Sequence, residues 1–341
     1  MKIQKSTPTL EDVARRADVS TATVSRCLNM PATVREETRR RVSEAVDALG
    51  YTPHFGARAL ASNRTNTIGA IIPTMENAIF ARGIQALQEA LGKAGVTLLV
   101  ASTGYDPERE AQQIRVLLGR GVDGLLLIGE ARPQETYDFL RARGVPYVLA
   151  WSYRPDCPHI CVGFDNRASM RALGERVLEA GHRNIAMIAG ITAWNDRAVA
   201  RIAGVRDAMK AAGLDLPATR IIEAEYTADA GGAALNKFMA LDPHPTAIFC
   251  GNDVLAAGAL REARRLGLSV PDDLSIVGFD DIDLAAIVEP QLTTVHVPHR
   301  RMGLTAAKIL LAIREEGKGG KSAVFRTEIV ERGSLAPPHG S

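Results

Sequence analysis

The sequence predicts an α/β protein in which a small all-α head precedes a two-lobed body of doubly wound parallel sheets. Within the first 50 residues, apolar residues recur at helical spacing between residues that cap helices. From Ile68 onward, short continuous apolar runs alternate with amphipathic segments, a pattern typical of parallel strands covered on both faces. The part of the 341-residue chain beyond the head, about 270 residues, exceeds what one such sheet normally supports, so we expect two lobes.

Three short helices are expected in the head. The first begins at a capping-box sequence, residues 9–12, and a tight connection at Asp18-Val19 leads to a second helix capped by Ser20. Residues 33–36 are expected to cap the third helix, which stops at Gly50. The residues expected to face the core of the head are Leu10, Val13, Ala14, Ala17, Val24, Cys27, Leu28, Val42, Ala45, Val46 and Leu49.

The body is expected to be built on strands that are buried on both faces, because their apolar runs are continuous rather than alternating. The runs are residues 68–72, 96–101, 124–128, 147–150, 185–188, 247–250 and 276–279. Amphipathic segments between them predict the covering helices.

The apolar runs and the cysteines of the sequence indicate in which cellular compartment the protein works. No stretch reaches the roughly 18 consecutive apolar residues of a membrane span, and no apolar run near Met1 suits a signal peptide. The cysteines lack CxxC spacing and adjacent histidine clusters, so we interpret them as buried or incidental thiols in a reducing compartment. We therefore expect a cytoplasmic protein with no membrane partner. The four cysteines are Cys27, Cys157, Cys161 and Cys250.

Charge is unevenly distributed although the whole chain carries only +2. Residues 1–64 hold 11 Lys/Arg and 7 Asp/Glu, net +4, and the remainder holds 30 against 32, net −2. A basic head on a slightly acidic body indicates that the head meets a polyanion.

Helix, tight turn, helix is also the simplest way to place one helix in the major groove of DNA. With Val24 and Cys27 facing inward, the second helix presents Thr21, Ala22, Ser25 and Arg26 outward. Arg26 is suited to bind a guanine or a phosphate. Short helical pairs also occur without a nucleic-acid role, but the basic bias and the N-terminal position favour DNA binding.

Several ordered segments resemble the lactose/galactose-repressor (LacI/GalR) family of transcriptional regulators. The similarity starts with residues 9–29, TLEDVARRADVSTATVSRCLN, and covers almost the whole chain. It implies a periplasmic-binding-protein-like body, a homodimer and double-stranded operator DNA as partner. It also implies three regions: a helix-turn-helix DNA-binding domain at 1–53, a hinge helix and linker at 54–65, and a two-lobed effector-binding and dimerisation domain at 66–341. Further matching segments are residues 34–39, 49–53, 122–125, 249–253 and 292–295.

The resemblance assigns roles in the head. Thr21 and Ala22 become the main specificity positions, with Arg26 supporting base or phosphate contact. Residues 56–61 resemble the family's hinge helix, in which Leu60 is pushed into the minor groove at the operator centre. Read without the family, Leu60 is an ordinary apolar helix residue. The full set of expected DNA-binding residues is Thr9, Ser20, Thr21, Ala22, Thr23, Ser25, Arg26, Asn29, Tyr51, Arg58, Leu60 and Ala61.

The body is expected to bind a small effector between its lobes rather than to act as an enzyme. It contains no Walker loop, no GxGxxG after a strand and no GxSxG. By resemblance, Asp253, with Asn252 before it, and Arg201 contact the ligand, while Phe80 and Tyr226 border it. Asp253 is otherwise a favourable carboxylate at a helix N-terminus, and either aromatic ring is otherwise part of the core.

Arg197 lies four residues before Arg201, so both guanidinium groups share one helix face or its first turn. Two like charges repel there unless an anion sits between them, which favours a small carboxylate or phosphate. The alternative is a salt bridge from one arginine to Asp196 or Asp207.

Further segments particularly resemble the gluconate-operon repressor branch, which makes a sugar acid such as gluconate the leading effector. A departure is the segment Ala150-Trp151-Ser152, where many relatives carry an aspartate that binds sugar hydroxyls. A neutral sugar, a sugar phosphate or a purine is the alternative effector, and a solute-binding protein or a sugar-converting enzyme is the rival class. The segments that carry this similarity are residues 77–80, 104–108, 162–166, 196–197, 289–292 and 301–303.

No cofactor and no metal are expected. The acidic run at residues 280–283 lacks calcium-loop spacing and is interpreted as a strand-end turn with solvated carboxylates. His296 and His299 flank a proline and are interpreted as structural.

Overall fold

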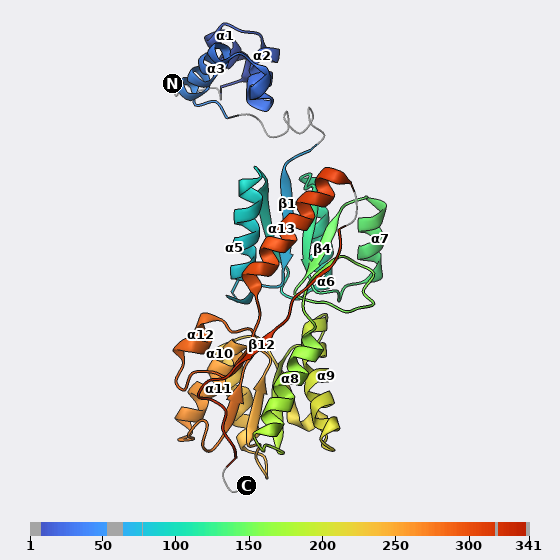
Figure 1. Ribbon diagram of the computed structural model, residues 1–341, viewed down its shortest axis with the longest axis vertical. Helices are drawn as coiled ribbons and strands as arrows, with labels where there is room; N and C mark the ends of the chain where they lie inside the picture. Colours follow the sequence, from blue (N-terminus) through green and yellow to red (C-terminus); the bar gives the residue numbers. More distant parts are fainter. Residues whose placement is uncertain (1–7, 53–63, 77, 318–319, 339–341) are drawn as a thin grey trace, which may run out of the picture. The chain divides into compact units, whose positions relative to one another are not determined.

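The computed structural model describes residues 8–52, 64–76, 78–317 and 320–338. It has the predicted class, a helical head followed by an α/β body with parallel sheets (Figure 1). The chain divides into two compact units, Met1–Thr65 and Asn66–Ser341, which are described separately below.

Over residues 8–52, the head consists of three α-helices packed around a small apolar core. Thr9 and Asp12 form the predicted capping box of α1, Ser20 accepts the Thr23 amide at the start of α2, and Asp18 makes the turn between them with φ 51°. Its core residues are Val13, Ala14, Ala17, Val24, Cys27, Val42, Ala45 and Tyr51. The elements are α1 (Leu10–Ala17), α2 (Thr21–Asn29), a 3₁₀ turn (Pro31–Thr33) and α3 (Glu36–Leu49).

The predicted start of the third helix is wrong in one respect. Thr33 lies in the 3₁₀ turn, and Arg35 precedes the first residue of α3 without a side-chain cap. The 3₁₀ turn takes up Thr33, whose hydroxyl donates to the Met30 carbonyl at 2.7 Å instead of serving the helix. The end of α3 at Gly50, with φ 61°, is as predicted.

The first lobe of the body is a parallel six-stranded sheet in the order β11-β5-β4-β3-β1-β2. Helices α5 and α13 pack on one face through residues such as Leu87 and Met302, and α6 and α7 pack on the other through Ile114 and Leu140. The elements are β1 (Thr67–Ile72), α5 (Ala78–Lys93), β2 (Thr97–Ser102), α6 (Pro107–Gly119), β3 (Gly124–Ile128), α7 (Gln134–Ala142), β4 (Tyr147–Ala150), β5 (Cys161–Gly163), α13 (His299–Glu316) and β11 (Ala323–Val324).

The second lobe is a parallel four-stranded sheet in the order β7-β6-β8-β9. Helices α8 and α9 cover one face and α10 and α11 the other. The elements are α8 (Asn166–Glu179), β6 (Ile185–Gly190), α9 (Asp196–Ala211), a 3₁₀ turn (Ala218–Arg220), β7 (Ile221–Ala224), α10 (Ala228–Met239), β8 (Ala247–Cys250), α11 (Asp253–Arg265), β9 (Ser275–Val277) and α12 (Asp283–Ile287).

The chain passes between the lobes three times, after β5, between β10 (Thr294–His296) and α13, and between β11 and β12 (Glu328–Val330). Strands β10 and β12 pair antiparallel, the only antiparallel ladder among the described strands. Every run predicted as a strand contributes one, but β2 is a partly exposed edge strand rather than buried on both faces. Apolarity along the sequence does not distinguish an edge strand from a central one.

Candidate functional site

The outer side of α2 presents the side chains that the sequence predicts for reading DNA. Thr21, Ala22 and Arg26 are exposed, and Thr23 and Ser25 are half-buried. Arg26 Nε donates a long hydrogen bond, 3.5 Å, to the Ala22 carbonyl of its own helix. So weak a contact is easily exchanged for a base edge or a phosphate.

Three other residues of the predicted DNA-binding set shape the head. Thr9 Oγ1 accepts the Asp12 amide and Ser20 Oγ accepts the Thr23 amide, each at 3.2 Å, so both fix the starts of helices. Tyr51 is 7% exposed and belongs to the core of the head. The side chain of Asn29 and the residues Arg58, Leu60 and Ala61 lie outside the described residues.

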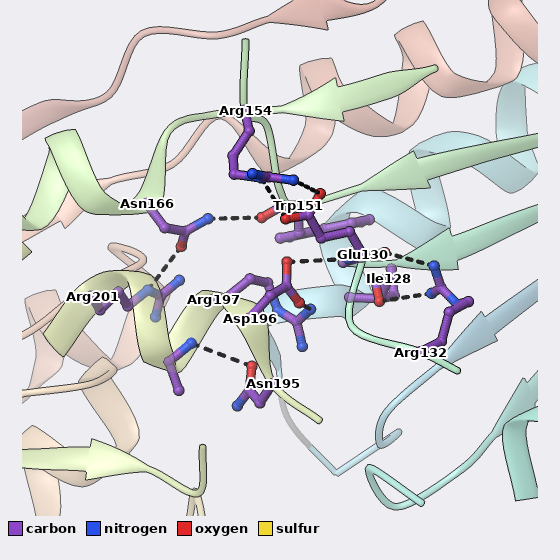
Figure 2. Close-up of polar contacts among 12 residues, drawn as sticks. Ile128, Glu130, Arg132, Trp151, Arg154, Asn166, Asn195, Asp196, Arg197 and Arg201 are labelled. Atoms are coloured by element: carbon purple, nitrogen blue, oxygen red, sulfur yellow. Dashed lines mark hydrogen bonds and ion pairs between the residues drawn. The ribbon is translucent and has the colours of Figure 1, made fainter. Parts of the chain in front are cut away.

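Arg201 is 5% exposed and is held by acceptors from several elements. Its Nε donates to Asn166 Oδ1 at 3.0 Å, its Nη1 to the Gly251 carbonyl at 2.6 Å, and its Nη2 to Asp280 Oδ1 at 3.4 Å. The guanidinium also lies 3.8 Å from the Phe279 ring centroid. Figure 2 shows Asn166 between Arg201 and the Trp151 carbonyl, to which Asn166 Nδ2 donates at 3.0 Å. Asn166 thus connects Arg201 of the second lobe to the first lobe.

Asn252 and Asp280 leave buried polar atoms unpaired near this arginine. Asn252 Oδ1 accepts the Leu255 amide and caps α11, while its Nδ2 has no hydrogen-bond partner. Asp280 Oδ2 is also without a partner although Asp280 is fully buried. Buried polar atoms of this kind cost free energy unless a further group satisfies them, so they mark a place where a polar ligand or water belongs.

Asp253 is already engaged inside the second lobe. Its Oδ1 accepts from the Thr294 hydroxyl at 2.6 Å, and its Oδ2 accepts the Ile282 amide at 2.9 Å. Burial and then the neighbouring Asp280 carboxylate raise the pKa of Asp253 to about 8. Asp253 therefore orders the segment after β9, and Asp280 is the carboxylate that faces Arg201.

The interpretation of residues 280–283 as a solvated turn is wrong for its first two members. Asp280 is fully buried, and Asp281 accepts from Arg332 Nη2 at 2.7 Å and contacts His296 Nδ1 at 2.8 Å. The segment closes over the second lobe instead of ending in solvent, because Arg201 and Arg332, distant in sequence, supply the counter-charges. His299 is structural as predicted, since its Nδ1 accepts the Trp151 indole N–H at 2.9 Å.

Arg197 is paired with Asp196, one of the two acids that the sequence left open. Arg197 Nη1 lies 2.9 Å from Asp196 Oδ1, whereas Asp207 pairs with Arg167 at 2.6 Å. Asp196 Oδ2 also accepts the backbone amide of Glu130 in the first lobe at 3.1 Å (Figure 2). Each arginine of the predicted pair thus has its own carboxylate, Asp196 for Arg197 and Asp280 for Arg201.

Gly129, Glu130, Asp196 and Arg197 together make what we call the interlobe contact. Gly129 has φ 69°, and a Cβ there would lie 1.9 Å from Arg197 Nη1 and 2.2 Å from Asp196 Oδ1. The first lobe therefore approaches the start of α9 more closely than a side chain at this position allows. Arg132 supports the contact from behind by donating to the Gly129 and Ile128 carbonyls at 3.1 and 3.3 Å.

A cavity of about 310 Å³ lies between the lobes. Tyr226 and Asn195 line it from the second lobe, and Tyr105 lines it from the first. The Tyr105 and Tyr226 ring centroids are 6.2 Å apart, and burial raises the pKa of Tyr105. The other lining residues are Thr74, Glu76, Gly104, Ile191, Ala193, Ala224, Glu225 and Thr227.

A second, much smaller space shares Tyr105 with the first, and Arg197, Trp194 and Thr103 also line it. The predicted effector residues therefore do not form one group. Tyr226 lines the larger cavity, Arg197 the smaller one, and Arg201, Asn252 and Asp253 lie in the buried polar network. Phe80 is 3% exposed and packs edge-on against Trp151 in the core.

Sequence reasoning missed Tyr105, Trp194 and Asp280 as members of this region. The signal for Asp280 was available, because it directly follows an apolar run and the carboxyl ends of parallel strands meet at one edge of a sheet. Trp194 was not predictable in this way, because it is an exposed loop residue that belongs to no apolar run or helical pattern.

Neither a cluster of metal-ligating side chains nor a membrane-spanning helix is found within the described residues. No group of three or more His, Cys, Asp or Glu side chains among them is placed to hold a metal ion. None of the helices over the same ranges is long and apolar enough to cross a membrane.

Comparison with known proteins gives two family matches and many full-length relatives. Residues 9–54 match the profile "Bacterial regulatory proteins, lacI family", and residues 175–335 match "Periplasmic binding protein-like domain". The chain is 36% identical over 331 residues to the HTH-type transcriptional repressor PurR of Vibrio cholerae, covering 96% of this chain and 98% of that protein. It is 33% identical over 310 residues to the HTH-type transcriptional regulator GntR of Escherichia coli, covering 91% and 93%. The lac repressor dimer bound to operator and the anti-inducer ONPF is similar in structure, with TM-score 0.84 and 26% identity over 97% of this chain and 100% of that one.

Proposed function

This chain belongs to the lacI family of bacterial regulatory proteins, and from that membership we propose that a small effector bound between its lobes sets its affinity for operator DNA. The chain is a DNA-binding transcriptional repressor, and its relatives are regulators rather than enzymes. We assign DNA reading to residues 1–53, the hinge to 54–65, and effector binding and dimerisation to 66–341. Because operator DNA lies in the cytoplasm of bacteria, we also propose that compartment for this chain.

The interlobe cavity is the observation that carries this proposal. A ligand that touches Tyr105 in one lobe and Tyr226 in the other gains contacts only when both lobes are in place. Such a ligand favours one degree of lobe closure over another, which is how a small molecule biases a two-lobed protein. In a homodimer, the same change alters how the two heads meet the halves of a palindromic operator.

We propose a sugar acid as the effector. Glu76, Glu225, Thr74 and Thr227 offer acceptors and hydroxyls for a polyol around the larger cavity. Arg197 lines the adjoining space and supplies a planar donor for a carboxylate, provided that Asp196 gives way. The resemblance to the gluconate-operon repressor branch points the same way.

The test is a thermal-shift panel on the purified chain with gluconate and related sugar acids, neutral sugars, sugar phosphates and purines. A ligand at 100 times its Kd stabilises the folded state by about 2.7 kcal/mol, a measurable rise in Tm. We expect sugar acids alone to raise Tm and Arg197→Gln to abolish the rise. The matched control Arg141→Gln changes an exposed arginine of the first lobe and leaves the response intact.

Stabilisation by neutral sugars, sugar phosphates or purines alone would contradict the sugar-acid assignment and keep the repressor. A compound that raises Tm but leaves the binding of selected DNA sites unchanged would contradict effector control itself.

A further inference from the structure

Two of the four cysteines, expected from the sequence to be buried or incidental thiols, lie side by side in the first lobe. The Sγ atoms of Cys157 and Cys161 are 3.3 Å apart, and both thiols are free. Their four-residue spacing is not a recognised motif, so spacing alone offers no reason to pair them. The structure supplies that reason, because the irregular loop after Trp151 folds back onto β5.

The two thiols differ in how firmly they are held. Cys161 is 1% exposed and lies in β5, where its amide donates to Ser322 Oγ at 3.0 Å. Cys157 is half-buried in the loop, where its amide donates to the Arg154 carbonyl at 3.2 Å. A bonded pair of sulfurs is about 2.05 Å apart, so the gap closes by a shift of little more than 1 Å. An irregular loop accommodates such a shift more readily than a strand in the middle of a sheet.

We propose that Cys157 and Cys161 form a dithiol site that reacts with a small disulfide, RSSR, and closes to an intrachain disulfide. The Cys157 thiolate attacks one sulfur of RSSR, forming a mixed disulfide and releasing one RS⁻ that takes up the proton lost by Cys157. The Cys161 thiolate then attacks the Cys157 sulfur and releases the second RS⁻, which takes up the proton of Cys161. The protein loses two hydrogens and RSSR becomes two RSH.

Accessibility assigns the order of the two steps. Cys157 is the more exposed thiol, whereas Cys161 is buried in β5. Burial raises the pKa of Cys161, which suits a thiol that reacts second with a sulfur already held beside it. Cys27 and Cys250 are buried in other parts of the chain.

The site is joined to the interlobe contact through Arg154, three residues before Cys157. Arg154 Nε donates to Glu130 Oε1 at 2.7 Å, and the Glu130 amide donates to Asp196 of the second lobe at 3.1 Å. The loop that must move on oxidation is thus the loop that holds Glu130. We expect the disulfide to loosen the interlobe contact, whatever the effector is.

The experiment exposes the reduced full-length protein to glutathione disulfide, then alkylates the remaining thiols and measures intact mass. We expect the wild type to lose two of its four thiols together and to gain no glutathione. Cys161→Ser should stop at a glutathione adduct on Cys157, and Cys157→Ser should keep its remaining thiols. Cys27→Ala, in the separate head, should behave as the wild type.

Two further measurements keep the proposal open to failure even where a variant folds poorly. Phenylarsine oxide, which bridges two neighbouring thiols, should bind the native wild type one to one and neither single variant. Hydrogen exchange at the Glu130 amide should be faster in the oxidised wild type. A wild type that stays reduced, ends as a glutathione adduct or forms disulfides between chains overturns the dithiol site, and unchanged exchange at Glu130 overturns its link to the lobes.

Discussion

The two arginines of α9, Arg197 and Arg201, show that the role of a charged side chain depends on the groups packed around it. Arg197 and Arg201 lie on one helix face, which favoured a shared external anion. The protein instead gives each its own carboxylate, at 2.9 Å from Asp196 and 3.4 Å from Asp280. Removing one partner of such a buried pair leaves an uncompensated charge, so neither arginine tolerates substitution of its acid without consequence.

Asp253 makes the free energy of unfolding fall as pH rises, which is the opposite of the usual effect of a carboxyl group. Its pKa is about 8 in the folded protein, above the usual 3.8, so between these values the folded chain holds a proton that the unfolded chain lacks. The free energy of unfolding therefore falls as pH rises from 6 to 8, by up to about 1.4 kcal/mol per unit for one proton. We expect Asp253→Asn to remove this contribution, measured by urea unfolding at pH 6, 7 and 8.

Asp207→Asn is the matched control, because Arg167 lowers the pKa of Asp207 and that carboxylate does not titrate in this range. Its unfolding free energy should keep the pH slope of the wild type. Parallel slopes for the wild type and Asp253→Asn would show that Asp253 is already ionised at pH 6.

Arg26 is the exposed cation of α2, and replacing it should change which DNA sequences the protein prefers. We expect Arg26→Ala to weaken binding to DNA sites selected from a random library by about 1–3 kcal/mol and to relax preference at one base pair per half-site. Fluorescence anisotropy on single-base variants of the selected site measures both. Arg40→Ala, on the exposed side of α3, should keep the wild-type preference. Equal loss on every sequence would make Arg26 a phosphate contact.

Local residue interactions were predictable from the sequence and distant ones were not. The caps at Thr9 and Ser20 act over three residues, so spacing alone identifies them. Arg201 and Asp280 are 79 residues apart, and no pattern in the sequence around either residue predicts that the two pair. The cap at Thr33 failed for a local reason, since a 3₁₀ turn competed for the same hydroxyl.

At the scale of elements, long apolar runs were located well because burial on two faces leaves a continuous signal. The missed strands are short or carry little burial: β5 has three residues, β11 has two, and β7 is a half-exposed edge. Strand β10 depends on pairing with β12, 34 residues further on, and so is specified by tertiary structure.

The loop between β3 and α7 allows a test of how closely the lobes meet. Gly129→Ala forces an alanine into a left-handed conformation and places its Cβ on Asp196 and Arg197. We expect the interlobe contact to break, with a lower Tm and faster hydrogen exchange at the Glu130 amide. Gly144→Ala has the same strain, about 1–2 kcal/mol, because Gly144 has φ 62° but no atom within 4 Å of its Cβ.

The difference between the two glycine variants isolates the clash from the strain. If Gly144→Ala lowers Tm as much as Gly129→Ala and the Glu130 amide stays protected in both, the lobes do not depend on the missing Cβ.

Across the whole molecule, one apolar core continues from the first lobe into the second through Trp151, Phe164 and Phe279. Because only three chain passages join the lobes, a ligand between them acts on a joint with few covalent connections. The sequence predicted the two lobes from chain length and strand pattern. The arrangement of the cavity could not be predicted, because residues from both lobes line it.

Effector and DNA binding must be reciprocal if one equilibrium of the molecule links them. If a saturating effector weakens binding to a selected DNA site tenfold, that DNA must weaken effector binding tenfold, a coupling of about 1.4 kcal/mol. Isothermal titration of the effector into the free protein and into the protein–DNA complex measures this. Equal affinities in the two titrations, alongside a tenfold effect on DNA, would place the DNA effect outside the cavity.

The carboxylate of Asp196 also sets a threshold for any acidic effector. Because Asp196 is the neighbouring residue, its carboxylate competes with any bound acid for the Arg197 guanidinium, at an effective concentration of about 1 mM or more. A free carboxylate must displace Asp196 before it binds the guanidinium. Its apparent affinity is therefore reduced by the fraction of molecules in which Arg197 is unpaired. For the acidic effector that we propose, this competition shifts the response to higher effector concentrations than an unpaired Arg197 would require.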